Sequence, residues 1–301
     1  MQLPKEPSPL QKLECELYSR KQVQVFMKRD DLLHPHIQGN KWRKLKYNLQ
    51  AAKEQGHKQL LTFGGYYSNH IYATAAAAKL FGLESVGVIR GHEPKEHSET
   101  LKFTQSQGMI LKFVSREQFA NKYEPQFLQE LRNEFGESYF LPEGGTNQLA
   151  IKGVAEIIEE TSSDFDAICC ACGTGGTLAG LVAGMKGKGQ IIGFSSLKGE
   201  DQLTDSVHTL IKEYCGFIYS NFKINHDYLF GGYAKWNEEL MVYIQQFKQT
   251  HGLLLDPVYT SKMMYGVEQL IQQDYFAPNT KIMCLHTGGL QGWAGVNGVI
   301  H

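Results

Sequence analysis

Gly39-Asn40-Lys41-Trp42-Arg43-Lys44-Leu45-Lys46-Tyr47 is the stretch from which the rest of the chain can be interpreted. Behind it, apolar residues recur at helical spacing: Trp42, Leu45, Leu49 and Ala52. The pattern predicts a helix that has Asn40 as its N-cap and ends near Gly56. At about 100° per residue, Arg43 falls on the far side of this helix. Lys41 begins half turned toward the interior, with Lys44 one turn further on.

The position of Lys41 allows two interpretations. A half-buried lysine loses hydration, which lowers the pKa of its amine and frees a nucleophile. Alternatively, the stem of the side chain covers the core while its ammonium stays in water. The helix alone favours the second interpretation, because buried lysines are rare. The rest of the chain favours the first.

Size and composition indicate a globular α/β protein rather than a nucleic-acid or membrane protein. The 301 residues suffice for two domains, and 42% hydrophobic with 20% charged residues is ordinary for such proteins. A net charge of −1 gives no electrostatic reason to expect nucleic acid or a membrane as partner. No apolar run approaches the roughly 20 residues of a membrane span, and we expect no signal peptide.

The six cysteines predict no metal site. Cys169 and Cys172 have C-x-x-C spacing, but they lie in an apolar run that indicates a buried strand. No second such pair or histidine pair completes a zinc site. We interpret the cysteines as small core residues in a reduced compartment, which predicts the cytoplasm.

Apolar strands alternate with helices through most of the chain, which predicts parallel sheets covered by helices on both faces. The first fifteen residues are uninformative, and residues 197–236 are irregular and rich in aromatics. Four suspect segments each follow an apolar strand: 64–69, 173–177, 259–260 and 286–289. Ligands bind beyond the carboxyl ends of the strands in such sheets, so we expect these segments to share one site.

Gly173-Thr174-Gly175-Gly176-Thr177 can direct several backbone N–H groups at one anion, aided by the positive end of the helix that follows. It is not a P-loop, because no Gly-Lys-Ser/Thr ending is present. It is not a dinucleotide fingerprint either, because Leu178 occupies the place of the third glycine. A single phosphate is the expected ligand. The alternative is a glycine turn that packs a helix against a strand.

Ser68 and Asn69 open a helix, where they can bind a carboxylate or phenolate oxygen or act as a plain N-cap. Tyr259 can stack on a flat ring or lie in the core.

Thr260 and Thr287 each present a hydroxyl at a strand end, as ordinary turn residues also do. His70 and His286 can be histidines with local partners, and we assign neither a catalytic role.

A phosphate cradle, a half-buried lysine, an asparagine and a ring-stacking tyrosine together suit pyridoxal 5′-phosphate. The chain resembles the fold-type-II pyridoxal-phosphate enzymes, specifically the 1-aminocyclopropane-1-carboxylate deaminase and D-cysteine desulfhydrase family. The resemblance runs from Arg29-Asp30-Asp31 to Gly289. It depends on five ordered motifs: Gly39-Asn40-Lys41 with Arg43-Lys44-Leu45, Ser68-Asn69, Thr174-Gly175 with Thr177, Asp256-Pro257-Val258-Tyr259, and His286-Thr287-Gly288-Gly289.

The resemblance implies that Lys41 forms the Schiff base with the cofactor and moves the α-proton, with Lys44 near the phosphate. It also implies that Asn69 binds the O3′ of the ring and that Ser68 meets the substrate carboxylate. The glycine loop from Gly173 to Thr177 would hold the phosphate.

The same resemblance implies that Tyr259 stacks against the pyridine. Tyr233, in Gly231-Gly232-Tyr233, matches the family's further active-site tyrosine, although its surroundings align poorly.

Two departures from the family pattern bear on the substrate. Deaminase members tend to have glutamate where this chain has Thr260, with Thr287 as a second hydroxyl nearby. A neutral hydroxyl cannot stabilise a protonated pyridine as a carboxylate can. Tyr66, Tyr67 and Tyr72 also stand where the family usually has other residues, which predicts a changed substrate pocket.

The weaker electron sink favours β-elimination from a small amino acid such as D-cysteine, giving pyruvate, ammonia and sulfide. One alternative is 1-aminocyclopropane-1-carboxylate deamination to 2-oxobutyrate and ammonia, and another is an amino-acid racemase or other lyase on the same cofactor. A nucleotide-binding α/β protein and a catalytically silent relative are further alternatives. The nucleotide interpretation lacks an acidic ribose partner about 20 residues past the glycine loop.

The resemblance implies two open α/β domains with the cofactor in the cleft between them. We expect a smaller domain, residues 52–143, inserted into a larger one formed by residues 1–51 and 144–301. It also implies a homodimer.

Overall fold

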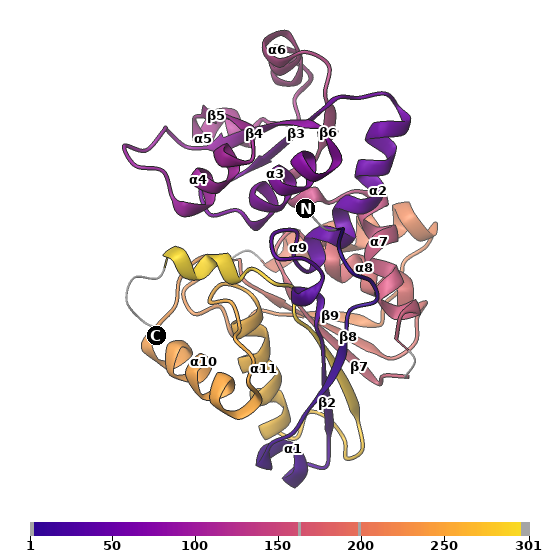
Figure 1. Ribbon diagram of the computed structural model, residues 1–301. Helices are drawn as coiled ribbons and strands as arrows, with labels where there is room; N and C mark the ends of the chain where they lie inside the picture. The colour runs from indigo at the N-terminus through magenta and orange to yellow at the C-terminus, as the bar shows by residue number, and fades with distance from the viewer. Residues whose placement is uncertain (1–2, 162–163, 198–199, 296–301) are drawn as a thin grey trace.

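Two mainly parallel sheets form the framework of the molecule (Figure 1). The computed structural model describes residues 3–161, 164–197 and 200–295. The six-stranded sheet has the order β1-β2-β10-β7-β8-β9. Its strands are β1 (Leu10–Leu13), β2 (Gln24–Lys28), β10 (Lys281–Leu285), β7 (Ala167–Cys172), β8 (Gln190–Ser195) and β9 (Phe222–Asn225). The four-stranded sheet has the order β5-β4-β3-β6. Its strands are β5 (Met109–Val114), β4 (Glu84–Arg90), β3 (Gln59–Gly64) and β6 (Tyr139–Leu141).

Helices connect these strands, as parallel pairing requires. They are α1 (Glu16–Arg20), α2 (Asn40–Glu54), α3 (Asn69–Phe81), α4 (Glu99–Ser106), α5 (Arg116–Ala120), α6 (Pro125–Phe135), α7 (Gln148–Glu159), α8 (Gly176–Met185), α9 (Glu200–Cys215), α10 (Glu238–His251) and α11 (Thr260–Gln272). Three short 3-10 turns complete the described chain: η1 (Asp30–Leu32), η2 (Glu143–Gly145) and η3 (Leu290–Gly295).

The six-stranded sheet is covered on both faces, because side chains alternate along its strands. On β7, Cys169 packs into the core beneath α11, whereas Cys170 and Cys172 pack into the core beneath α7 and α8. Figure 1 shows α10 and α11 on one side of this sheet and α7 and α8 on the other. The cysteines on β7 are therefore small core residues, as the apolar run predicted, and all six cysteines carry free thiols.

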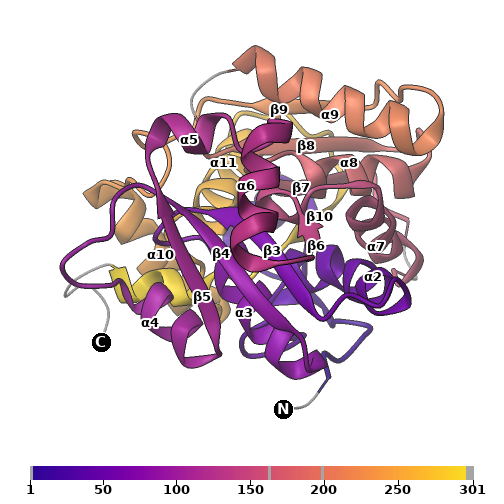
Figure 2. The same cartoon turned by 90° about the horizontal axis from the view of Figure 1, so that it is seen from above.

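The four-stranded sheet lies against α3 and the long helix α2. Alanines of α3 share a core with Leu45, Leu49 and Ala52 of α2. Small side chains permit this close approach of the two helices. Because α2 also packs against α7, it belongs to the contact between the two sheets (Figures 1 and 2).

The α/β class with parallel sheets is confirmed, and three local expectations are corrected. β1 pairs antiparallel with β2, so an antiparallel edge strand lies in the uninformative N-terminal segment. Residues 197–236 are not irregular throughout, because α9 and β9 lie within them; residues 198–199 are outside the described chain. The N-cap of α2 is Gly39 rather than Asn40.

The strands of the four-stranded sheet all lie between residues 59 and 141, while the six-stranded sheet takes strands from both sides of that interval. The boundaries 52–143 for an inserted domain remain our proposal. None of the helices in the described ranges combines the length and apolar character needed to cross a bilayer.

Candidate active site

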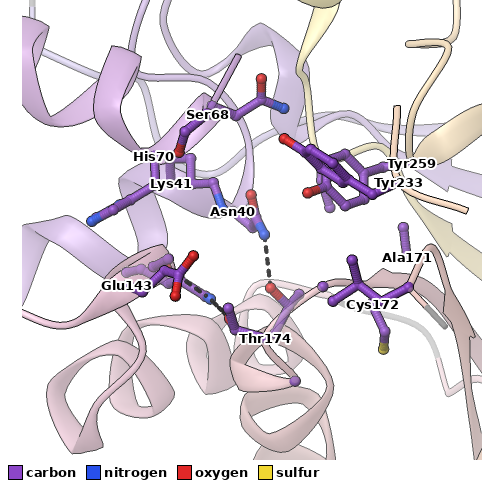
Figure 3. Close-up of a pocket in the computed structure, with 18 of the residues that line it drawn as sticks. Asn40, Lys41, Ser68, His70, Glu143, Ala171, Cys172, Thr174, Tyr233 and Tyr259 are labelled. Carbon is purple, nitrogen blue, oxygen red and sulfur yellow. Dashed lines mark hydrogen bonds between the residues drawn. The ribbon is translucent and has the colours of Figure 1, made fainter. Parts of the chain in front are cut away.

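A cavity of about 360 Å³ collects residues from both sheets and from α2 (Figure 3). This volume lies in the usual range for small-molecule sites. The four predicted catalytic residues, Lys41, Ser68, Tyr233 and Tyr259, all line it. So do most of the predicted cofactor-binding residues: Lys44, Asn69, Gly173, Thr174, Gly175, Thr177 and Thr287. Gly176 and Thr260 are not among the described lining residues.

The start of α2 is fixed by close contact with the segment after β10. Gly39 has φ +57°, and a Cβ there would overlap the backbone carbonyl of Thr287. Only glycine fits this contact, so it occupies the N-cap position that we predicted for Asn40. Asn40 instead donates from Nδ2 to Thr177 Oγ1 at 2.8 Å, across the cavity (Figure 3).

Lys41 points into the cavity from the first turn of α2. Burial lowers the pKa of its amine from 10.5 to about 8. No hydrogen bond or ion pair joins this amine to a residue of the described ranges. A free amine with a lowered pKa is the group that the sequence analysis predicted.

Lys44 is only 2% exposed and lies one turn further along α2. Its Nζ donates to the carbonyl of Gly144 at 3.1 Å and to Thr146 Oγ1 at 3.0 Å. Burial, followed by the charge of Lys41, holds the pKa of Lys44 well below its usual value. An anion bound beside it would replace the missing counter-charge.

The far side of α2 is buried too. Arg43 is 0% exposed and pairs with Asp30 at 3.0 Å, and also with Glu160 and Glu6. The helical period placed Arg43 on the side of α2 away from its apolar stripe, and the structure agrees. That side is buried as well, because residues distant in the sequence pair with Arg43 there. These ion pairs anchor the helix that presents Lys41.

The glycine loop follows β7 and leads directly into α8. Gly175 is the N-cap of α8 with φ +80°, a conformation that favours glycine. The first backbone N–H groups of α8 lack helical partners and, with the helix dipole, favour an anion. Gly176 leaves room for Lys44, because a Cβ there would lie 3.0 Å from Lys44 Nζ.

Ser68 and Asn69 form the N-terminus of α3. Ser68 is the N-cap, and its Oγ accepts from the backbone N–H of Ile71 at 3.3 Å. Asn69 Oδ1 accepts from Gln291 Nε2 at 2.8 Å. Within the described chain, the Nδ2 of Asn69 has no acceptor, so it is free to donate to a ligand.

Tyr259 and Tyr233 form a pair of phenols in the cavity, with ring centroids 6.0 Å apart at 61° (Figure 3). Burial raises the pKa of Tyr259 well above its usual value, and the neighbouring Tyr233 raises it further. Burial also raises the pKa of Tyr233, while a hydrogen bond with Tyr259 opposes this.

Thr260 begins α11 and is fully buried. Its hydroxyl donates to Asp256 Oδ1 at 2.5 Å and accepts from the backbone N–H of Asp256 at 3.0 Å. A direct contact of Thr260 with a cofactor therefore remains a prediction.

The three unusual tyrosines make contacts elsewhere. Tyr66 donates to the carbonyl of His92, and Tyr72 stacks on Phe103 at 3.9 Å. Tyr67 is 54% exposed. None of these tyrosines is among the described residues that line the cavity. The lining therefore does not support the expectation that they change the substrate pocket.

The cavity wall includes His70, to which we assigned no catalytic role. Its Nε2 lies 2.7 Å from Thr62 Oγ1, and Thr62 donates to the carbonyl of Leu141. Nε2 therefore carries the ring proton, and Nδ1 is left as a buried acceptor without a partner in the described chain. Burial, aided by Lys41 and Lys44, holds the pKa of His70 well below its usual value.

Sequence reasoning missed two charged residues of the cavity. Arg90 ends β4, and Glu143 follows β6 in η2. Glu143 lies 3.3 Å from Lys122 Nζ, whereas Arg90 forms no ion pair with any described residue. Arg90 is the last residue of its strand and Glu143 lies two residues beyond the end of its own. The rule about carboxyl ends of strands, applied to every strand, would have found them.

The arrangement fits a flat aldehyde that carries a phosphate. The glycine loop and Lys44 suit the phosphate, the free amine of Lys41 suits the aldehyde, and Tyr259 offers a ring face. The unpartnered Nδ2 of Asn69 supplies a donor for an oxygen on the ring.

Comparison with known proteins agrees with this chemistry. The model of a family described as pyridoxal-phosphate dependent enzymes matches residues 1–288. A Pyrococcus horikoshii protein whose name groups it with the 1-aminocyclopropane-1-carboxylate deaminases is 33% identical, over 89% of this chain and 85% of its own. The D-cysteine desulfhydrase of Serratia proteamaculans is 30% identical, over 94% of this chain and 91% of its own. A crystal structure of a 1-aminocyclopropane-1-carboxylate deaminase homologue superposes with a TM-score of 0.85 at 32% identity, covering 97% of this chain and 92% of that one.

Proposed function

We propose a specific reaction for this chain, which belongs to the 1-aminocyclopropane-1-carboxylate deaminase and D-cysteine desulfhydrase family of fold-type-II pyridoxal-phosphate-dependent enzymes. The reaction is β-elimination from a small amino acid, with D-cysteine as the first candidate. The products would be pyruvate, ammonia and sulfide. Bound pyridoxal phosphate supplies an electron sink for the α-carbon of the substrate.

The observation that carries this choice is Thr260. Its hydroxyl is engaged with Asp256, and Glu143 is the only carboxylate among the described lining residues. A carboxylate beside the pyridine nitrogen would hold it protonated, and a neutral hydroxyl cannot do so. Opening a cyclopropane needs the stronger electron sink, whereas loss of a leaving group from the β-carbon needs less. Elimination is therefore favoured over deamination of the cyclopropane.

In this proposal each residue has a defined task. Lys41 holds the cofactor through its amine and moves the α-proton, since burial keeps the pKa of this amine at about 8. Lys44 and the glycine loop hold the phosphate. Asn69 donates to the ring oxygen, and Ser68 at the N-terminus of α3 binds the substrate carboxylate.

We assign the two phenols to the leaving-group side of the substrate, because they lie together in the cavity wall. Tyr259 would support the ring. Tyr233, whose phenol stays protonated because burial raises its pKa, would donate a proton to the leaving sulfur. Both tyrosines are partly buried, and with a substrate bound their rings would help to exclude water from this part of the cavity.

A product assay tests the proposal directly. Purified holoenzyme is incubated with D-cysteine, L-cysteine, D-serine and 1-aminocyclopropane-1-carboxylate, and pyruvate, sulfide and 2-oxobutyrate are measured. We expect pyruvate and sulfide from D-cysteine and at most traces of 2-oxobutyrate. Efficient release of 2-oxobutyrate from the cyclopropane would contradict the role given to Thr260. A homodimer and a cytoplasmic location remain proposals that this assay does not address.

A further inference from the structure

The loop that carries Tyr233 has an unusual backbone. Phe230, Gly231, Gly232 and Ala234 all have positive φ, at +48°, +89°, +110° and +52°. The left-handed region suits the two glycines but is unfavourable for Phe230 and Ala234, whose Cβ atoms crowd the backbone. Contacts from outside the loop must therefore hold it in this shape.

Lys262 of α11 provides such contacts. Its side chain is buried, with 1% of the residue exposed, and its Nζ donates to the carbonyls of Leu229 at 2.8 Å and Gly232 at 2.7 Å. The same two carbonyls accept from the backbone N–H groups of Gly232 and Lys235. The ammonium thus joins two successive turns, residues 229–232 and 232–235, which share Gly232.

No carboxylate in the described chain pairs with this ammonium. Asp256 is close enough to affect Lys262 electrostatically, but its oxygens accept from the N–H groups of Val258, Tyr259 and Thr260. Burial lowers the pKa of Lys262 to about 8, which reflects the cost of placing this charge inside the protein. An apolar side chain would avoid that cost, so stability alone does not explain a lysine here.

The geometry gives Lys262 a role in the cavity. Tyr259 immediately precedes α11, and Lys262 lies in the first turn of that helix. One rigid element therefore carries Tyr259 itself and, through the ammonium, the loop of Tyr233. The ring centroids of the two tyrosines lie 6.0 Å apart in the cavity wall (Figure 3).

We propose that Lys262 is a positioning residue, which holds the loop of residues 229–235 so that Tyr233 stays beside Tyr259 in the substrate part of the cavity. The inference rests on the proposed function, in which Tyr233 acts on the leaving group. It does not depend on which amino acid is the substrate.

The test uses the holoenzyme and the variant Lys262→Met, which keeps an apolar stem and removes the donors. We expect backbone amides of residues 229–235 to exchange with deuterium about tenfold faster, because the two turns lose their shared donor. We expect kcat with D-cysteine to fall about tenfold, with little change in KM. Lys248→Met, at an exposed position on α10, is the matched control and should change neither quantity.

A double-mutant cycle separates positioning from a general structural role. If Lys262 acts through Tyr233, Lys262→Met should cost little further activity in a Tyr233→Phe background. Fully additive losses, or unchanged amide exchange in residues 229–235, would overturn the proposal. If Lys262→Met does not fold, Lys262→Gln, which retains two N–H donors on a shorter stem, is measured in the same two ways. If neither the wild type nor any variant turns over D-cysteine, the assignment of the substrate is wrong. The exchange measurement alone then decides whether Lys262 holds the loop of residues 229–235.

Discussion

The two sheets contribute different kinds of group to the cavity. The six-stranded side supplies mainly backbone groups, from the glycine loop after β7. It adds the partly buried ring of Tyr259 before α11 and Thr287 after β10. The four-stranded side supplies polar side chains at the ends of its strands and in the loops after them: Ser68, Asn69, Arg90 and Glu143. Lys41 and Lys44 come from α2, which packs against helices of both sides.

This difference suggests a division of tasks. Backbone donors on the six-stranded side are fixed by glycines and by core packing, so they suit a group that is always present. Polar side chains on the other side can change without disturbing a core. We therefore expect the six-stranded side to determine how tightly the phosphate of the cofactor is held. We expect the four-stranded side, apart from Asn69, to determine how the substrate binds.

The largest effect is expected at α2, which serves both sides. In the proposed function the amine of Lys41 holds the cofactor and moves the proton, so Lys41→Ala should lower turnover by about three orders of magnitude or more. Lys44→Ala should leave the cofactor attached to Lys41 but weaken its affinity by about 10- to 100-fold, since a charged donor to the phosphate is lost. Borohydride reduction followed by peptide mass spectrometry locates the attachment. Attachment to Lys44 in the wild type would reverse the two roles.

A matched pair of glycine substitutions compares the two sides directly. At Gly176 a Cβ would lie 2.8 Å from Thr146 Oγ1 and 3.0 Å from Lys44 Nζ. Gly176→Ala should therefore weaken cofactor binding by about tenfold. Gly65 also lines the cavity, but from the four-stranded side, and a Cβ there meets nothing within 4 Å.

Gly65→Ala should accordingly leave cofactor affinity unchanged. Fluorescence titration of the two apoenzymes with pyridoxal phosphate measures both values. An equal loss of affinity for pyridoxal phosphate in the two variants would mean that the glycine loop does not bind the phosphate.

The sequence predicted the six-stranded side of the cavity better than the other side, for a physical reason. A strand such as Ala167–Cys172 followed by a glycine loop and a helix is encoded by neighbouring residues, and the structure has those bounds for β7. The burial of Arg43 depends instead on Glu6, Asp30 and Glu160, which lie far apart in the chain. No periodicity within α2 contains that information.

The same reasoning explains the other differences. The ends of β4 and β6 mark Arg90 and Glu143 as candidates, but that these ends open into the same cavity as the glycine loop depends on how the two sheets face each other. α9 was recognisable, since its buried Leu203, Val207 and Ile211 recur at helical spacing. Glycine and aromatic residues around it obscured that pattern.

The pH dependence of cofactor uptake tests the state of Lys41. Only the neutral amine attacks an aldehyde, and burial lowers the pKa of Lys41 from 10.5 to about 8. The rate of uptake by the apoenzyme should rise about tenfold per pH unit below pH 8 and become constant above it. With an unshifted pKa the rise would continue to about pH 10. Stopped-flow absorbance from about pH 6 to about pH 9.5 distinguishes a lowered from an unshifted pKa of Lys41. A free lysine derivative is the control, and its rate of reaction with the cofactor should keep rising over this range.

The smallest effect is expected from substitution of Arg90. This substitution tests the contribution of the four-stranded side to substrate binding alone. Its guanidinium contacts the ring of Phe119 at 5.8 Å and has no ion partner in the described chain, while Glu143 is paired with Lys122. Arg90 therefore places an unpaired positive charge in the cavity wall, where it can attract an anionic group of a substrate. Arg90→Gln should raise KM by about two- to fivefold, as expected for an exposed charge, and leave cofactor affinity unchanged.

Arg90→Lys, which keeps the charge, should recover most of this loss in KM. Lys112→Gln on β5, where Lys112 pairs with Glu134 outside the cavity, is the control for a general change in surface charge. High salt should reduce the difference in KM between the wild type and the Arg90→Gln variant, because exposed charges are screened. A loss of cofactor affinity in Arg90→Gln equal to its rise in KM would show that the two sides of the cavity do not divide their tasks in this way, since one side chain from the four-stranded sheet would then serve both ligands.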